Sequence, residues 1–138
     1  MAGPAERKNV SVNSILVPVA VGELLDKITI LEIKNDRIDD ADKRRNVRVE
    51  LDGLWPLWEG LRAQHPEMDG LKQQLRAVNE RMWDVQDALR AKEAAQTFDA
   101  EFITLARAVA TTNGERVGLK NAINRVAGSR FVEEKQYR

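Results

Sequence analysis

The sequence predicts an all-α protein, an antiparallel bundle of about four helices preceded by a short extended segment. Apolar residues recur at three- and four-residue spacing along most of the chain, which is the period of a helix packed on its neighbours. Aspartate, proline and glycine interrupt this period where turns are needed. With 138 residues, 43% of them hydrophobic, the chain is long enough for one compact domain. We expect a single helical domain over residues 1–138, with residues 1–9 flexible and residues 129–138 as a C-terminal tail.

The N-terminal elements are an extended segment and a helix that other helices must surround. Residues 10–21 are apolar and rich in β-branched side chains, and Pro18 favours extended backbone. They form either an extended segment packed on the bundle, which we favour, or an edge strand. The first helix is expected from Gly22 to Ile38, with apolar residues around most of its circumference. Its charged residues must therefore lie close to contacts between helices.

The second helix follows the acidic run 39–42, which supplies helix-stop and N-cap residues. Its apolar positions alternate four- and three-residue steps, at Val47, Leu51, Leu54, Trp58 and Leu61. Pro56 lies within this series. Because proline removes a backbone donor, we expect the helix either to kink there or to restart with Pro56 in its first turn.

The third and fourth helices are the longest and are expected to form a projecting hairpin. His65-Pro66 marks the turn before the third, whose apolar series is Leu71, Leu75, Val78, Met82, Val85 and Leu89. Thr97 is the predicted N-cap of the fourth. Asn113-Gly114 favours a turn, but the apolar phase continues across it to Val126, so we predict one long helix. Gly128 is the predicted stop.

Composition narrows the possible functions. The 22 basic residues are balanced by 22 acidic ones, so we expect no nucleic-acid partner, and no window is apolar enough for a membrane span. Cysteine is absent and His65 is the single histidine, which leaves no thiolate zinc site, cysteine nucleophile or di-iron Glu-x-x-His pair. We predict a cytoplasmic protein with no catalytic residue, metal or cofactor.

Three motifs resemble a bacterial family of small proteins known only as a domain of unknown function. They are VGELLDKITILEIK at residues 21–34, FITLARAV from Phe102 with the residues that follow it to Asn124, and the tail GS..VEEK.Y from Gly128. Members of this family tend to be encoded near glycosyltransferases or tetratricopeptide-repeat proteins, so the resemblance implies a link to surface-polysaccharide or glycosylation systems. Family members usually carry aspartate at the position of Gly114, and the glycine is expected to loosen the helix by about 1 kcal/mol.

The clearest candidate site is a polar ridge on the fourth helix. Spacings of three, four and four residues place four polar side chains along one side of it, and Arg107 lies further along the same helix; the candidates are Arg107, Asn113, Arg116, Lys120 and Asn124. Two fixed cations beside amide donors suit a phosphate or carboxylate. The alternative, which we favour, is that Arg116 pairs with Asp26 or Glu32 of the first helix and holds the bundle in register.

Two functional hypotheses follow. The first is a non-catalytic interaction or assembly protein, a bundle that forms a homo-oligomer or docks on a protein partner. The second is a small all-helical enzyme or binding protein that uses the Arg116 and Lys120 ridge for an anionic metabolite. We favour the first, because the long helices leave apolar surface for association.

Overall fold

The computed structural model describes residues 13–129 and 133–134 and confirms the predicted bundle. These residues contain helices and no strand. In chain order, the helices are α2 (Val21–Arg37), α3 (Ala41–Gln64), α4 (Met68–Ala94) and α5 (Ala100–Ala127). Residues 1–9 lie outside the described residues, as do Phe131, Val132 and Tyr137 of the predicted tail.

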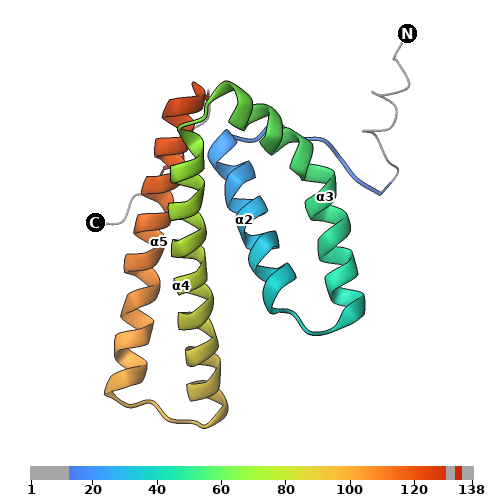
Figure 1. Cartoon of the computed structure of the whole chain (residues 1–138). Helices are drawn as coiled ribbons and strands as arrows, with labels where there is room; N and C mark the ends of the chain where they lie inside the picture. Colours follow the sequence, from blue (N-terminus) through green and yellow to red (C-terminus); the bar gives the residue numbers. More distant parts are fainter. Residues whose placement is uncertain (1–12, 130–132, 135–138) are drawn as a thin grey trace.

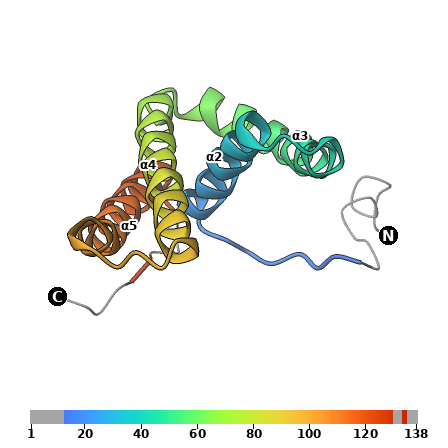
Figure 2. The same ribbon diagram turned by 90° about the horizontal axis from the view of Figure 1, so that it is seen from below.

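Helix α2 is the centre of the fold. It packs against α3, α4 and α5, whereas α3 contacts α4 only slightly. Figure 2 shows α3 beyond α2, on the side away from α5. Helices α4 and α5 form the most extensive helix pair and extend past the ends of α2 and α3 (Figure 1). The sequence prediction of a projecting hairpin is therefore correct.

Helix ends follow the sequence signals with one correction. Asp40 caps α3 by accepting a hydrogen bond from the backbone N–H of Lys43 at 2.9 Å. The N-cap of α5 is Asp99, which accepts from the backbone N–H of Phe102 at 3.0 Å, so the prediction of Thr97 was wrong. A carboxylate at the N-cap also interacts favourably with the helix dipole. Gly128 ends α5 with φ of 67°, in the left-handed region that glycine adopts readily.

Neither α3 nor α5 ends at the helix-breaking signal within its sequence. Helix α3 continues through Pro56 without a restart, and its C-terminal part leans toward the start of α4 (Figure 1). Helix α5 continues through Asn113-Gly114, as the phase of its apolar residues predicted. A proline loses one backbone hydrogen bond in a helix interior, but packing of the apolar face outweighs that local cost.

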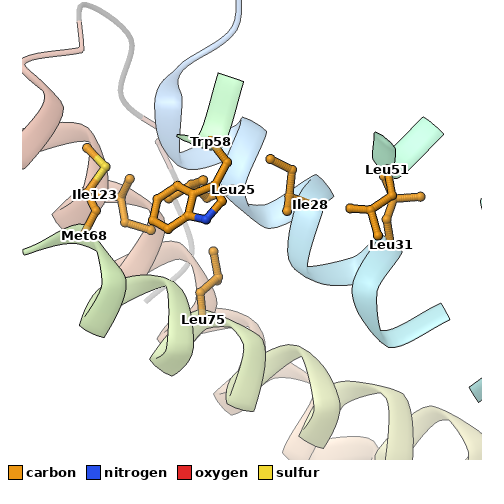
Figure 3. Close-up of a cluster of buried hydrophobic side chains, with 8 residues drawn as sticks. All are labelled: Leu25, Ile28, Leu31, Leu51, Trp58, Met68, Leu75 and Ile123. Carbon is orange, nitrogen blue, oxygen red and sulfur yellow. The ribbon is translucent and has the colours of Figure 1, made fainter. Parts of the chain in front are cut away.

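The core is built on α2 from both sides. Figure 3 shows Trp58 beside Leu25, with Leu75 close by, whereas Leu31 meets Leu51 further along α2. The complete cluster is Leu25, Ile28, Leu31, Leu51, Trp58, Met68, Leu75 and Ile123. Because every helix contributes at least one of these side chains, their burial holds the four helices together.

Residues 13–20 form an extended, largely exposed arm, of which Pro18, Val19 and Ala20 line a hollow together with bundle residues. Its side chains are exposed, with Ile15 87%, Leu16 69%, Val17 63% and Val19 51% accessible. The arm leaves the start of α2 and runs away from the helices (Figures 1 and 2). The sequence correctly predicted extended backbone, but the expectation that this segment packs on the bundle was wrong for these four residues.

Candidate functional site

A buried carboxylate, Asp26, lies where α2, α4 and α5 meet. It is only 2% exposed, and Arg116 of α5 reaches it with two hydrogen bonds, from Nε at 2.8 Å and from Nη2 at 2.5 Å. Asn79 of α4 donates to the same carboxylate at 3.0 Å and to the hydroxyl of Thr29 at 3.0 Å. The Thr29 hydroxyl donates to the backbone carbonyl of Asp26 at 2.9 Å.

Both oxygens of the Asp26 carboxylate are hydrogen-bonded in this network. Both carboxylate oxygens accept hydrogen bonds from Arg116, and these hydrogen bonds to Asp26 raise the pKa of Arg116 above its ordinary value. A two-point pair between guanidinium and carboxylate is geometrically specific. Since its partners come from three helices, we assign the pair to holding α2 in register with α4 and α5, as the favoured sequence interpretation expected.

A second ion-pair group surrounds Lys120, one turn further along α5. Its ammonium lies 2.8 Å from Glu23 of α2 and 2.6 Å from Glu133, and the residue is 5% exposed. Burial lowers the pKa of Lys120, but the hydrogen bonds to Glu133 and Glu23 outweigh it, so the pKa is raised. Asn121 holds the backbone of Glu133 through bonds of 3.0 Å at both its N–H and its carbonyl.

The third contact of this ridge is a close approach of two backbones. Asn124 Oδ1 accepts a hydrogen bond from the N–H of Gly22 at 2.7 Å. A Cβ atom at Gly22 would lie 2.3 Å from the carbonyl oxygen of Lys120. Glycine is therefore required for the first turn of α2 to lie this close to α5.

The predicted ridge is only partly brought together. Arg116, Lys120 and Asn124 all face α2, as their spacing predicted, and each has a partner there. Asn113 is half-buried and makes none of these contacts. Arg107 is exposed and lies nine residues before Arg116, about 13 Å along the helix, on a different surface.

The second predicted carboxylate, Glu32, belongs to a different group. It pairs with Lys72 of α4 at 3.0 Å and lies 3.9 Å from Arg76. The Lys72 ammonium also lies 5.4 Å from the ring centroid of Trp55 and 5.3 Å from that of Trp58. This is a cation between two indoles and a carboxylate, a stable structural arrangement. Asp26 and Glu32 therefore do not share a site, as their six-residue separation predicted.

Sequence reasoning missed Asn79, although a signal for it was present. Asn79 stands four residues after Leu75 and three before Met82, so it occupies a core-facing position of α4 and is 5% exposed. A polar residue at such a position needs a buried partner. Lys72, which follows Leu71 directly, gave no comparable signal.

A pair of hollows lies on the opposite face of the hairpin. Asn79 of α4 and both Arg116 and Lys120 of α5 face α2. Ala77 and Arg81 each lie two residues from Asn79, and Gly118 lies two residues from both Arg116 and Lys120. Two residues turn a helix by about 200°, so Ala77, Arg81 and Gly118 point about 160° away from α2. Two adjoining hollows of about 510 and 480 Å³ lie between α4 and α5 there. They share Arg81 and the carboxylate bonded to it, Glu115. We call the two hollows together the hairpin groove.

Most of the side chains that line the hairpin groove are apolar or small. The hollow nearer the start of α4 is lined by Gln74, Ala77, Val78, Gly118 and Leu119, and the hollow nearer the α4–α5 turn by Val85, Ile103, Thr104, Arg107, Ala108, Thr111 and Thr112. Ile103 is 57% exposed although it is aliphatic. Within residues 13–129 and 133–134, no helix is long and apolar enough to span a membrane.

Comparisons with known proteins identify the family of this chain. No similar protein was found among curated proteins or among solved structures. One family model matches residues 15–138, which covers both ion-pair groups, the hairpin groove and most of the exposed arm. The chain therefore belongs to the family of unknown function DUF6165.

Proposed function

We propose that this protein is a non-catalytic assembly module whose hairpin groove packs against the same groove of a second copy. The observation that carries the proposal is the open, largely apolar groove along the α4–α5 pair, the face of the hairpin opposite α2. Exposed apolar surface is where protein interfaces tend to form. Two hairpins packed face to face would complete a four-helix bundle.

Charge favours a second copy over another partner. Arg81 is the middle residue of α4, and Glu115 lies near the middle of α5. Around a two-fold axis at this level, Arg81 of each copy would meet Glu115 of the other, which makes the groove self-complementary. This axis runs along the hairpin, so each hollow would face the same hollow of the second copy. A net charge of zero also removes long-range repulsion between copies.

The hairpin is large enough for a stable dimer. Helices of 27 and 28 residues are each about 40 Å long. Two adjacent helices present a face about 20 Å wide, so a strip along the full hairpin would bury about 800 Å² per copy. That is the area of a standard stable interface. The exposed arm, Ile15 to Val19, is further apolar surface that favours association.

The anion-binding alternative on the predicted ridge has less support. Arg116 and Lys120, its two cations, are each paired with carboxylates, Asp26 for the first and Glu23 with Glu133 for the second. An anion at this ridge would have to displace those partners from a largely buried position, and separating a buried ion pair is costly.

The test is the mass in solution, measured by light scattering over a range of concentrations. The wild-type chain of 15.6 kDa should have twice that mass at tens of micromolar. Gly118→Glu places a charge in the groove, where a Cβ atom meets nothing within 4 Å, so the monomer should stay folded and the dimer should dissociate. Gly60→Glu on α3 adds the same charge at another open position and should remain dimeric.

Two results would refute the dimer. One is a wild-type mass of 15.6 kDa at every concentration, and the other is equal dissociation by both glutamate variants. Circular dichroism of each variant establishes that it is folded.

The cellular setting of this module is a further part of the proposal. The family resemblance supports a bacterial cytoplasmic protein that serves surface-polysaccharide or glycosylation systems. A tagged chain should then co-purify with a glycosyltransferase, and Gly118→Glu distinguishes recruitment by the dimer from recruitment by a monomer. Co-purification of proteins from unrelated systems only would contradict this link.

A further inference from the structure

A separate hollow lies on the opposite side of the hairpin from the groove, between α2, α4 and α5. Its volume is about 190 Å³, roughly the space of six water molecules. On the α2 side it is lined by Ile30, Ile33 and Lys34. Its other walls come from residues 79–86 of α4 and from Arg116 of α5. The register network around Asp26 therefore forms one end of this hollow.

At the end of the hollow formed by the Asp26 network, two polar atoms make no hydrogen bond within that network. Arg116 bonds Asp26 through Nε and Nη2, and its Nη1 has no hydrogen-bond partner among the described residues. Asn79 uses its amide nitrogen for both Asp26 and Thr29, and within the same residues its Oδ1 accepts no bond. Both side chains line the hollow and are held in place by their bonds to Asp26. The hollow is therefore lined by two side chains that are held in place and that each keep one polar atom unused by the network.

The hollow has one uncompensated positive charge. Lys34 lines it, and no carboxylate of the described chain lies within 4 Å of its ammonium. The charge of Arg116 is balanced by Asp26, and that of nearby Arg37 by Asp84 at 2.5 Å and Glu80 at 3.8 Å. The oxyanion of a ligand would balance Lys34.

The remaining wall is apolar and aromatic. Met82 and Trp83 of α4 line it, and Gln86 stands at the exposed edge with an amide that can donate or accept. The guanidinium of Arg37 lies 5.8 Å from the ring centroid of Trp83 and so fixes the indole. An indole that is held in this way offers a flat surface to the ring of a ligand.

We propose that this hollow binds a small organic anion, a carboxylate or phosphate monoester carried on a single ring. The oxyanion lies between the ammonium of Lys34 and Nη1 of Arg116, and the ring lies against Trp83. The volume of about 190 Å³ admits one ring with its charged substituent. The site faces away from the hairpin groove, so it does not depend on the dimer.

Titration with benzoate, phenyl phosphate and the neutral benzyl alcohol tests the site. We expect one or both anions to bind with millimolar or tighter Kd, by calorimetry and by shifts of one indole N–H signal in the ¹⁵N spectrum. Trp83→Phe assigns that signal. Benzyl alcohol should bind at least tenfold more weakly, and the preferred anion distinguishes carboxylate from phosphate.

Two variants test whether the positive charge of Lys34 binds the anion. Lys34→Gln should weaken anion binding about tenfold. Lys27→Gln, two turns earlier on the same helix and paired with Glu50 at 3.4 Å, should leave it unchanged. Absence of binding by both anions at 10 mM overturns the proposal. So does equal binding of benzyl alcohol, or an unchanged Kd in Lys34→Gln.

Discussion

The close contact between the first turn of α2 and the backbone of α5 gives the sharpest stability prediction. In Gly22→Ala, the new Cβ atom would lie 2.3 Å from the carbonyl oxygen of Lys120 and 2.9 Å from Oδ1 of Asn124. Ordinary van der Waals contacts of a Cβ begin at about 3.4 Å, so the helices must separate by about 1 Å. Backbone atoms of α5 cannot rotate away as a flexible side chain could.

The expected change in the free energy of unfolding of Gly22→Ala is the sum of three contributions. Overpacking of this kind costs about 1–3 kcal/mol. Stretching the hydrogen bond from the Gly22 N–H to Asn124 costs about 1 kcal/mol more. Alanine regains up to about 1 kcal/mol over glycine through its helix propensity. The net expectation for Gly22→Ala is a loss of about 1–3 kcal/mol in the free energy of unfolding.

The control is a helical glycine with open space around it. A Cβ atom at Gly60 of α3 meets nothing within 4 Å, so Gly60→Ala should stabilise the protein by up to about 1 kcal/mol. Urea denaturation at one fixed protein concentration measures both variants, because dimerisation would make the stability depend on concentration. The two substitutions should shift the midpoint in opposite directions. A Gly22→Ala variant as stable as the wild type would refute the close approach of these helices.

The ion pairs and the core give three further predictions. Asp26→Ala leaves Arg116 without its carboxylate and should cost about 3 kcal/mol, whereas Asp26→Leu combined with Arg116→Met should recover most of that loss in urea denaturation. Because the pKa of Lys120 is raised above its unfolded value of 10.5, its stabilisation is complete below pH 10.5 and is lost as pH rises through the folded pKa. Thermal unfolding should therefore lose stability more steeply above pH 10.5 in the wild type than in Lys120→Met, and parallel curves would contradict this. Trp58→Ala should cost about 3–5 kcal/mol by urea denaturation, and a loss below 1 kcal/mol would show that Trp58 is not a core anchor.

The predictions that depended on the spacing of apolar residues and on the backbone preferences of single residues were mostly correct. The four helices, the continuity of α5 through Gly114 and the stop at Gly128 follow from spacing and backbone preference. Thr97 was a wrong N-cap because both Thr97 and Asp99 are suitable residues, and only the final geometry shows which one the amide of Phe102 reaches. The arm was expected to pack on the bundle because its side chains are apolar, a property that does not name the surface that covers them.

The sequence by itself determined the helices, the ridge of Arg116, Lys120 and Asn124, and the need for partners on α2, because helical periodicity fixes which residues share a face. Only the tertiary structure decided that Asp26 rather than Glu32 meets Arg116. It also decided that one face of the α4–α5 hairpin stays open. These outcomes depend on the rotation and offset of one helix against another. Many side chains set that packing together, so no single motif in the chain encodes it.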